Sequence, residues 1–264
     1  MPSGGAPGIS ANPGARLVVE HCVISCIGPA QGVSAWLPKL LIVEHSWINA
    51  ATIGVYVVGD PYKPVGGDAQ ISILANRITD GGCAIQLNGI HDNPLVSIHH
   101  NEITNRPQKY DGDLISIYRS SGTPGHPIEI QNNFVQGGTG WNCGGIVTDG
   151  DEPDPSLCTC YVDISYNQVV GCIWMGITLA FGFDEVAHDN TVITAGSVFF
   201  GMAIEGATQY QPVWMNHYLY LDDNTVGSWN VQTGCRADVK LWYASEAANV
   251  KRYNQPARRH DYGG

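Results

Sequence analysis

The sequence is poor in charged residues and has no long apolar run. Only 14% of its 264 residues are Asp, Glu, Lys or Arg, against roughly 25% in typical soluble domains. Helical bundles and coiled coils carry charged residues over much of their surface, so this composition argues against them. No stretch reaches the roughly 18 apolar residues of a membrane-spanning helix. With 44% hydrophobic residues the chain still has enough apolar material for a core, which argues against global disorder.

Basic residues are especially scarce. The chain has 13 Lys and Arg against 24 Asp and Glu, which gives a formal net charge of −11. A surface that binds duplex nucleic acid needs clustered basic side chains to neutralise phosphates. The only dense basic group is at the C-terminal end and consists of Lys251, Arg252, Arg258 and Arg259. We therefore expect no nucleic-acid partner.

The sequence contains many copies of one repeated motif. Two apolar residues spaced by two are followed by a key residue and, two positions later, by Ile or Val. The key residue falls at positions 22, 46, 76, 101, 133, 167, 190 and 224, and it is Asn in the last six copies. One of these copies is degenerate, because Glu185 and Ala187 stand at its two leading positions. β-Branched residues with a period of two predict short strands rather than helices.

Each copy also contains a second strand, which a small residue usually opens, as at residues 54–57 and 145–148. Units of 23 to 34 residues cannot bury an apolar face alone, so successive units are expected to stack. Stacking pairs each strand in parallel with its copy about 4.8 Å away and aligns the inward Ile, Val and Leu residues. The repeated Asn is expected to form a ladder in which each amide bonds the next one.

This pattern resembles the right-handed parallel β-helix repeat of the pectate-lyase-like superfamily. The resemblance covers roughly residues 16–243 and implies an all-β solenoid of about eight coils. Residues 1–15, which are rich in Gly and Pro and lack a signal peptide, are then a flexible lead, and residues 244–264 are a tail or partial cap. The superfamily includes polysaccharide lyases, glycoside hydrolases and phage tailspikes. It implies a secreted or cell-surface location, and the missing caps leave a homo-oligomer open.

The outward residues of the second strand form the predicted binding face. Aligning the copies by their small opening residue gives one outward column of Trp36, Val58, Asn88, Tyr118, Asp149, Ala180, Glu205 and Trp242. Aromatic rings stack on the apolar faces of sugars, while carboxylates bind hydroxyls or move protons. We therefore predict a polysaccharide or oligosaccharide partner. The predicted substrate-binding residues are Trp36, Asn88, Tyr118 and Trp242, with His91 and Asp92 from a following loop.

Asp149 and Glu205 are the predicted acid/base pair. In this alignment they lie two coils apart, about 9 to 10 Å. Inverting glycosidases hold their two carboxyl groups roughly 6.5 to 9.5 Å apart. We expect Asp151 and Arg119 to assist, and the favoured function is hydrolysis of glycosidic bonds.

Two alternative functions stay open. Asp149, Asp151 and Asp154 could offer oxygen ligands to Ca²⁺, and lyases of the superfamily commonly combine Ca²⁺ with a basic side chain. A Ca²⁺-dependent polysaccharide lyase with Arg119 as the base is the first alternative. The second is a non-catalytic β-helix, either a glycan-binding or a structural module of a larger surface or tailspike-like protein.

The cysteines do not decide the compartment. Cys143, Cys158, Cys160 and Cys172 fall within 30 residues of one another. Buried thiols, a disulfide and a zinc site all stay open, although the Cys-x-Cys spacing is not that of structural zinc sites.

Overall fold

The computed structural model describes most of the chain as strands and short turns. It covers residues 6–26, 28–50, 52–60, 69–91, 95–105, 112–137, 144–150, 157–172, 175–180, 182–196, 202–207, 219–222, 224–230, 234–236, 239–242 and 255–256. Side chains are described up to residue 193 and for Asn224. Within these residues no helix is long and apolar enough to cross a membrane.

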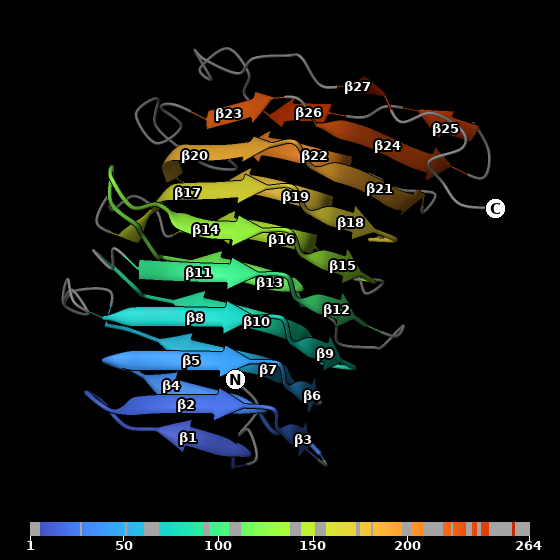
Figure 1. Ribbon diagram of the computed structural model, residues 1–264. Helices are drawn as coiled ribbons and strands as arrows, with labels where there is room; N and C mark the ends of the chain where they lie inside the picture. The colour runs from blue at the N-terminus through green and yellow to red at the C-terminus, as the bar shows by residue number, and fades with distance from the viewer. Residues whose placement is uncertain are drawn as a thin grey trace.

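The strands form a right-handed parallel β-helix, which confirms the predicted fold (Figure 1). The first wall is a nine-stranded sheet. Its strands are, in spatial order, β1 (Ile9–Ala11), β4 (Val33–Trp36), β7 (Ile53–Val58), β10 (Cys83–Asn88), β13 (Ile115–Tyr118), β16 (Gly144–Asp149), β19 (Met175–Ala180), β22 (Met202–Ala207) and β26 (Val239–Trp242).

The second wall is an eight-stranded sheet that carries the apolar residues preceding each key position. It consists of β2 (Arg16–Glu20), β5 (Leu40–Glu44), β8 (Gln70–Leu74), β11 (Leu95–His99), β14 (Ile128–Gln131), β17 (Thr159–Ser165), β20 (Gly182–His188) and β23 (Leu219–Asp222).

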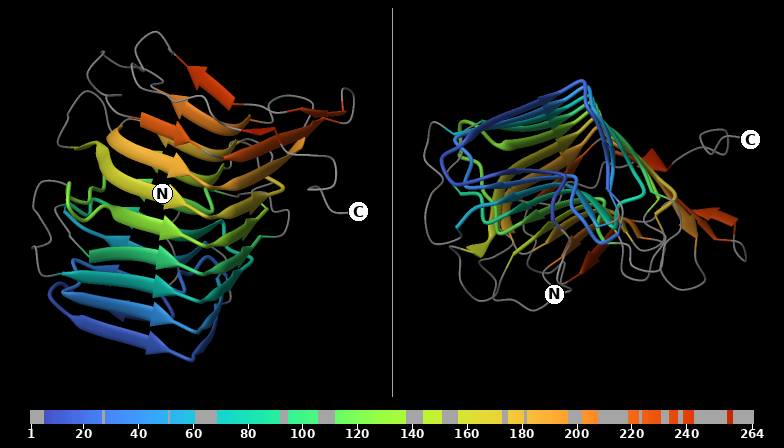
Figure 2. Two further views of the ribbon diagram at one scale, coloured as in Figure 1. Left: turned by 45° about the horizontal axis from the view of Figure 1, so that its top comes forward. Right: turned by 90° about the horizontal axis from the view of Figure 1, so that it is seen from below.

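The third wall follows each key position. It consists of β3 (Val23–Ser25), β6 (Trp47–Asn49), β9 (Arg77–Thr79), β12 (Glu102–Thr104), β15 (Phe134–Gln136), β18 (Gln168–Val170), β21 (Thr191–Gly196), β24 (Thr225–Asn230) and the antiparallel β25 (Gly234–Arg236), with β27 (Gln255–Pro256) beside β24. Seen along the axis, the three walls follow one another around a common interior (Figure 2).

The solenoid begins inside the segment that the sequence analysis set apart as a lead. Ile9 pairs with Val33 and Ala11 with Ala35, so β1 is the first strand of the nine-stranded sheet. At the other end, β27 lies within the predicted tail and pairs with β24. The strands therefore extend beyond both predicted boundaries of the solenoid.

The asparagine ladder is present as predicted. From Asn101 to Asn224, each Oδ1 accepts hydrogen bonds from the backbone N–H and the Nδ2 of the ladder residue one coil earlier, at 2.9 to 3.1 Å. Ser46 continues the ladder, since its N–H donates to Asn76. The residue before the key position adopts a left-handed backbone in seven coils, with φ between 49° and 58° at His21, His45, Ala75, His100, Asn132, Tyr166 and Asp189. The turn between the second and third walls is thus one repeated structure.

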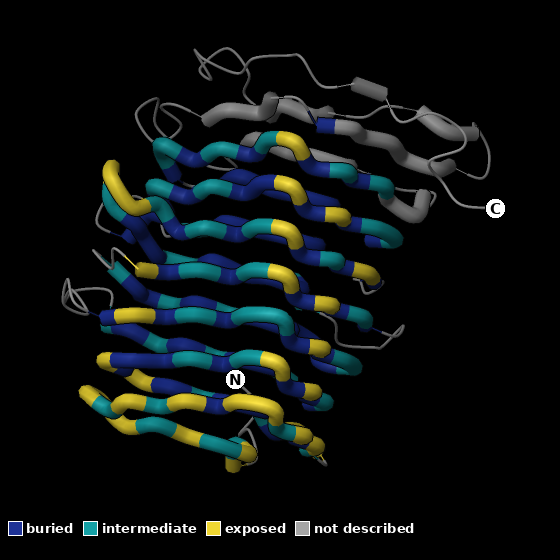
Figure 3. Tube along the Cα trace, viewed as in Figure 1, coloured by how far each residue is buried: buried dark blue, intermediate teal, exposed yellow. Residues whose placement is uncertain are grey.

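Inward side chains of all three walls fill a single aliphatic core. Along β8 and β11, buried and partly exposed residues alternate, as the tube coloured by burial shows (Figure 3). Ile73, Ile98, Ile130 and Ile164 are fully buried and occupy successive coils of one column. Because every coil repeats the same frame, the residues between the inward ones must face outward.

Gly54 is expected to tolerate no side chain, because it is the second residue of β7 and the backbone of the next coil comes close to it. A Cβ atom there would lie 2.6 Å from the carbonyl oxygen of Ala84 and 2.6 Å from Cγ2 of Ile78. We expect Gly54→Val to lower the free energy of unfolding by about 1 to 3 kcal/mol. Urea denaturation followed by circular dichroism measures the change. Gly125→Ala is the control, since nothing lies within 4 Å of that Cβ position; equal stability of the two variants would contradict the close approach at Gly54.

Candidate functional site

The predicted outward column on the nine-stranded sheet forms as far as Asp149. Backbone register aligns Trp36 with Val58, Asn88, Tyr118 and Asp149 in successive coils. The side chain of Trp36 is exposed, whereas Asn88, Tyr118 and Asp149 are partly buried. One stripe of the outer face therefore carries an aromatic ring, an amide, a phenol and a carboxylate in line.

Glu205 does not belong to this column, and its predicted alignment with Asp149 is wrong. Glu205 pairs with Thr178, whereas Ala207 pairs with Ala180 and with Trp242. The sequence alignment matched Gly201 to Gly176 as the small opening residue. In the structure Ile204 pairs with Ile177, which leaves Ala203 opposite Gly176.

The shift of two residues moves the backbones of Asp149 and Glu205 further apart than the alignment predicted. Two coils of about 4.8 Å combined with two residues of about 3.3 Å separate the Asp149 and Glu205 backbones by about 12 Å. The predicted spacing of about 9 to 10 Å between these two positions is therefore not kept. Glu205 instead pairs with Lys240 in the next strand. Trp242 keeps its predicted place in the column.

Asp149 supplies the carboxyl group of this column, and its pKa is raised. Its pKa is raised to about 6, chiefly by burial and also by the nearby carboxylate of Asp113, while a hydrogen bond from the Gly150 N–H and the charge of Arg119 oppose the rise. The Gly150 N–H donates to Oδ1 at 2.8 Å. Asp149 thus exchanges its proton close to neutral pH, as a general acid or base requires.

Arg119 lies beside Asp149 and contacts Tyr118. Its backbone N–H donates to the carbonyl oxygen of Asp149 at 2.9 Å. Its guanidinium carbon lies 4.7 Å from the centre of the Tyr118 ring, a cation–π geometry. The left-handed backbone of Arg119, with φ of 48°, turns the chain at the end of β13. The structure therefore brings together three of the residues singled out from the sequence.

The other predicted residues lie elsewhere or outside the described part of the chain. His91 contacts Ser121, with 3.2 Å between Nδ1 and Oγ. Asp92, Asp151 and Asp154 lie outside the described residues. The described residues contain no group of three or more His, Cys, Asp or Glu side chains that could hold a metal ion. The predicted Ca²⁺ site therefore depends on Asp151 and Asp154. Cys158, Cys160 and Cys172 are buried thiols, and Cys143 is not among the described residues.

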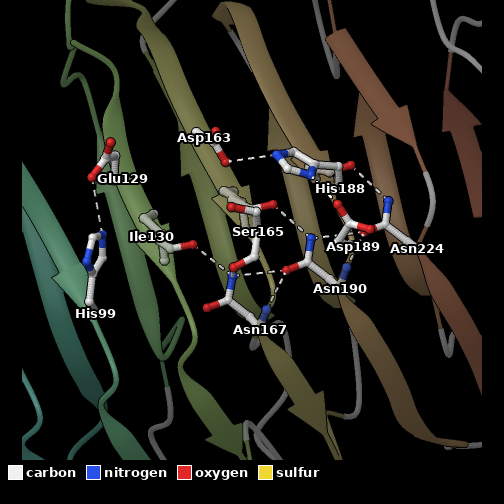
Figure 4. A network of polar contacts seen from close by, with 12 residues as sticks. His99, Glu129, Ile130, Asp163, Ser165, Asn167, His188, Asp189, Asn190 and Asn224 are labelled. Atoms are coloured by element: carbon white, nitrogen blue, oxygen red, sulfur yellow. Dashed lines mark hydrogen bonds and ion pairs between the residues drawn. The ribbon is translucent and has the colours of Figure 1, made fainter.

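A second group of titratable residues lies on the outer face of the eight-stranded sheet (Figure 4). Glu129 and Asp163 are register partners in β14 and β17. His99 Nε2 lies 3.5 Å from Glu129 Oε2, and His188 Nε2 lies 3.3 Å from Asp163 Oδ1. Asp189 contacts the other ring nitrogen of His188 at 2.7 Å. The alternation of the repeat already marks these positions as outward and would have found them.

The pKa values of the two histidines are shifted in opposite directions. Burial lowers the pKa of His99, and the charge of Glu129 only partly opposes this. Burial also lowers the pKa of His188, but hydrogen bonds and charges of Asp189 and Asp163 outweigh it and raise the pKa overall. His188, beside Asp163, therefore holds its proton more readily than His99, beside Glu129.

Comparison with known proteins gives this chain no relative: no family model, no curated protein and no solved structure matches it. The fold class rests on the strand register and the asparagine ladder alone. These define a parallel β-helix solenoid with titratable groups on two outer faces.

Proposed function

We propose that the protein is a carbohydrate-active β-helix of the pectate-lyase-like kind, which binds a polysaccharide along the outer face of the nine-stranded sheet and hydrolyses glycosidic bonds. The observation that carries the proposal is Asp149, which has a pKa raised to about 6 and lies in register with Tyr118. Trp36 and Asn88 extend the same column and offer a ring face and an amide to a sugar chain.

Asp149 supplies the proton that a departing sugar oxygen needs. A glycosidic oxygen is a poor leaving group unless an acid protonates it, and a carboxyl group with a raised pKa holds that proton. When Asp149 gives up the proton, Arg119 stabilises the resulting carboxylate. A second carboxylate must activate water, and Asp151 is the residue that the sequence offers two positions further on.

Asp149→Asn is expected to lower kcat at least about 100-fold, as loss of a general acid typically does. The assay follows new reducing ends and absorbance at about 235 nm on a panel of neutral and uronic-acid polysaccharides. Glu102→Gln is the matched control, because Glu102 is an exposed carboxylate on β12 in the third wall. Wild-type activity should fall as pH rises through about 6, where Asp149 loses its proton. Unchanged kcat in Asp149→Asn would remove Asp149 from the mechanism.

The same assay separates hydrolysis from the lyase alternative. Reducing ends without absorbance support hydrolysis. Absorbance that EDTA abolishes identifies a Ca²⁺-dependent lyase instead, with Arg119 as the base and Asp149, Asp151 and Asp154 as the metal ligands. This outcome would reject the proposed reaction but keep the substrate class.

A non-catalytic glycan-binding function is the second candidate, and the position of Glu205 favours it. Without Glu205, the described residues of the outward column contain one carboxylate, Asp149. Binding of a polysaccharide in affinity electrophoresis, together with no product in either assay, would establish this function and exclude hydrolysis of the substrates tested.

A further inference from the structure

A pocket of about 220 Å³ opens on the outer side of the eight-stranded sheet, away from the Asp149 column. Its floor comes from β8, β11 and β14, and its wall comes from the loop of residues 119–127 that precedes β14. The polar and apolar side chains that line it include Gln70, Leu95, Ser97, His126, Pro127 and Glu129. It is smaller than the roughly 300 to 1,000 Å³ pockets that hold drug-sized ligands, which fits a molecule the size of one sugar ring.

The wall of the pocket is held in place by the backbone. Thr123 and His126 exchange two hydrogen bonds of 2.9 and 3.0 Å, which close the tip of the loop. The N–H of Ser121 donates to Ile90, and that of Gly122 donates to Cys160 in a neighbouring coil. The loop packs so closely that a Cβ on Gly122 would lie 2.7 Å from three backbone atoms. The pocket is therefore preformed, which lowers the entropic cost of binding.

The floor presents polar groups at regular positions. Ser97 and Glu129 are register partners in neighbouring strands and point outward, because the residues on either side of each are buried. Gln70 and Leu95 are likewise register partners and are exposed. An amide, a hydroxyl and a carboxylate thus surround an apolar patch of Leu95 and Pro127, an arrangement that suits the hydroxyls and the apolar face of a sugar.

Within the described residues, Glu129 makes its ion-pair contact with a histidine rather than with a lysine or an arginine. Its ion-pair contact within the described residues is His99, and burial holds the pKa of His99 below its ordinary value. The neighbouring carboxylate of Asp163 contacts His188, whose pKa is raised. A cation would therefore interact more favourably with the carboxylate of Glu129 than with that of Asp163. The net charge of −11 favours cationic ligands in general.

We propose that this pocket binds one amino-sugar ring, with the ammonium group on Glu129 and ring hydroxyls on Ser97 and Gln70. The site is separate from the Asp149 column and on a different sheet, so it does not depend on hydrolysis there. Glu129 is about half exposed. The ammonium group is therefore expected to improve affinity only about five-fold, the scale of a surface ion pair.

Titration calorimetry with glucosamine and with glucose at pH 7 tests the proposal. Glucosamine is expected to bind about five-fold more tightly than glucose, and Glu129→Gln should remove the difference. Glu102→Gln, a matched loss of one exposed carboxylate on another sheet, should keep it. Asp149→Asn should also keep it, which distinguishes failure at this pocket from failure of the proposed hydrolysis. Added salt should reduce the preference for glucosamine.

Three results would overturn the proposal: no saturable binding of either sugar, equal affinity for the two sugars in the wild type, or a preference for glucosamine that survives in Glu129→Gln. Far-ultraviolet circular dichroism of each variant confirms that the fold is retained, so that a loss of binding is assigned to the pocket.

Discussion

Asn133→Ala is expected to lower the free energy of unfolding by about 3 to 5 kcal/mol, because it leaves several buried polar groups without partners. Asn133 is 1% exposed. Its Oδ1 accepts the N–H and the Nδ2 of Asn101, both at 2.9 Å, and its Nδ2 donates to Ile98 and Asn167. Alanine removes all of these bonds and supplies none. Urea unfolding followed by circular dichroism measures the loss.

Asn105→Ala provides the matched control for the ladder. Asn105 is also buried, but its Oδ1 and Nδ2 make no hydrogen bond with any group in the described part of the chain. Its replacement therefore removes a buried amide without leaving a hydrogen-bond partner unsatisfied. It is expected to change the free energy of unfolding by less than about 1 kcal/mol. Similar losses for Asn133→Ala and Asn105→Ala would show that the ladder hydrogen bonds contribute little.

Glu185→Gln is expected to raise the free energy of unfolding at pH 8 by about 1 to 3 kcal/mol, because glutamine, unlike the buried carboxyl group, does not have to take up a proton when the chain folds. Glu185 in β20 is completely buried and occupies an inward position in register with Val162 and Leu219. Gly182 makes room for it, since a Cβ there would lie 2.7 Å from Oε1. Burial raises the pKa of Glu185 well above its ordinary value, the nearby Thr148 hydroxyl lowers it, and the charge of Asp149 raises it.

The pH dependence gives Glu185 a signature of its own. Because its pKa is raised in the folded state, the folded protein binds the proton more tightly than the unfolded chain. Its contribution to stability is present at low pH and is lost as pH rises toward the folded pKa, by up to about 1.4 kcal/mol per pH unit. Asp113 and Asp149, with pKa values of about 6, contribute to the same trend only up to that pH.

Above about pH 6, the difference in the free energy of unfolding between Glu185→Gln and wild type therefore reports the contribution of Glu185 alone. Stability curves measured by urea unfolding between pH 6 and 9 should diverge steadily with increasing pH. Glu102→Gln, which alters an exposed carboxylate, should follow the wild-type curve. Parallel curves for Glu185→Gln and wild type would mean that the Glu185 carboxyl has the same pKa in the folded and unfolded states.

The sequence predicts the architecture well because one frame is repeated many times. The Ile or Val two residues after each key position fixes which residues point inward. Asn at six successive key positions specifies the turn between the second and third walls. The same frame already aligned Glu185 with the inward residues of other coils. Its burial follows from that alignment, whereas its pKa depends on neighbours such as Thr148 from another wall.

The candidate site was less predictable, since it depends on features that the frame does not fix. The nine-stranded sheet follows loops of variable length, so its register rests on a small opening residue. That signal is ambiguous where Gly201 and Ala203 both qualify, and the ambiguity misplaced Glu205 by two residues. The pocket at Glu129 needs the conformation of the loop of residues 119–127, which no repeat specifies.

The most direct test of the proposed function is the kcat of Asp149→Asn and of Glu205→Gln on a polysaccharide that the wild-type protein cleaves. The proposed function predicts a loss of at least about 100-fold for Asp149→Asn and a much smaller loss for Glu205→Gln, because it assigns the proton donor to Asp149 and gives Glu205 no role. Equal losses in the two variants, or full activity in Asp149→Asn, would contradict the assignment of Asp149 and the register that separates it from Glu205.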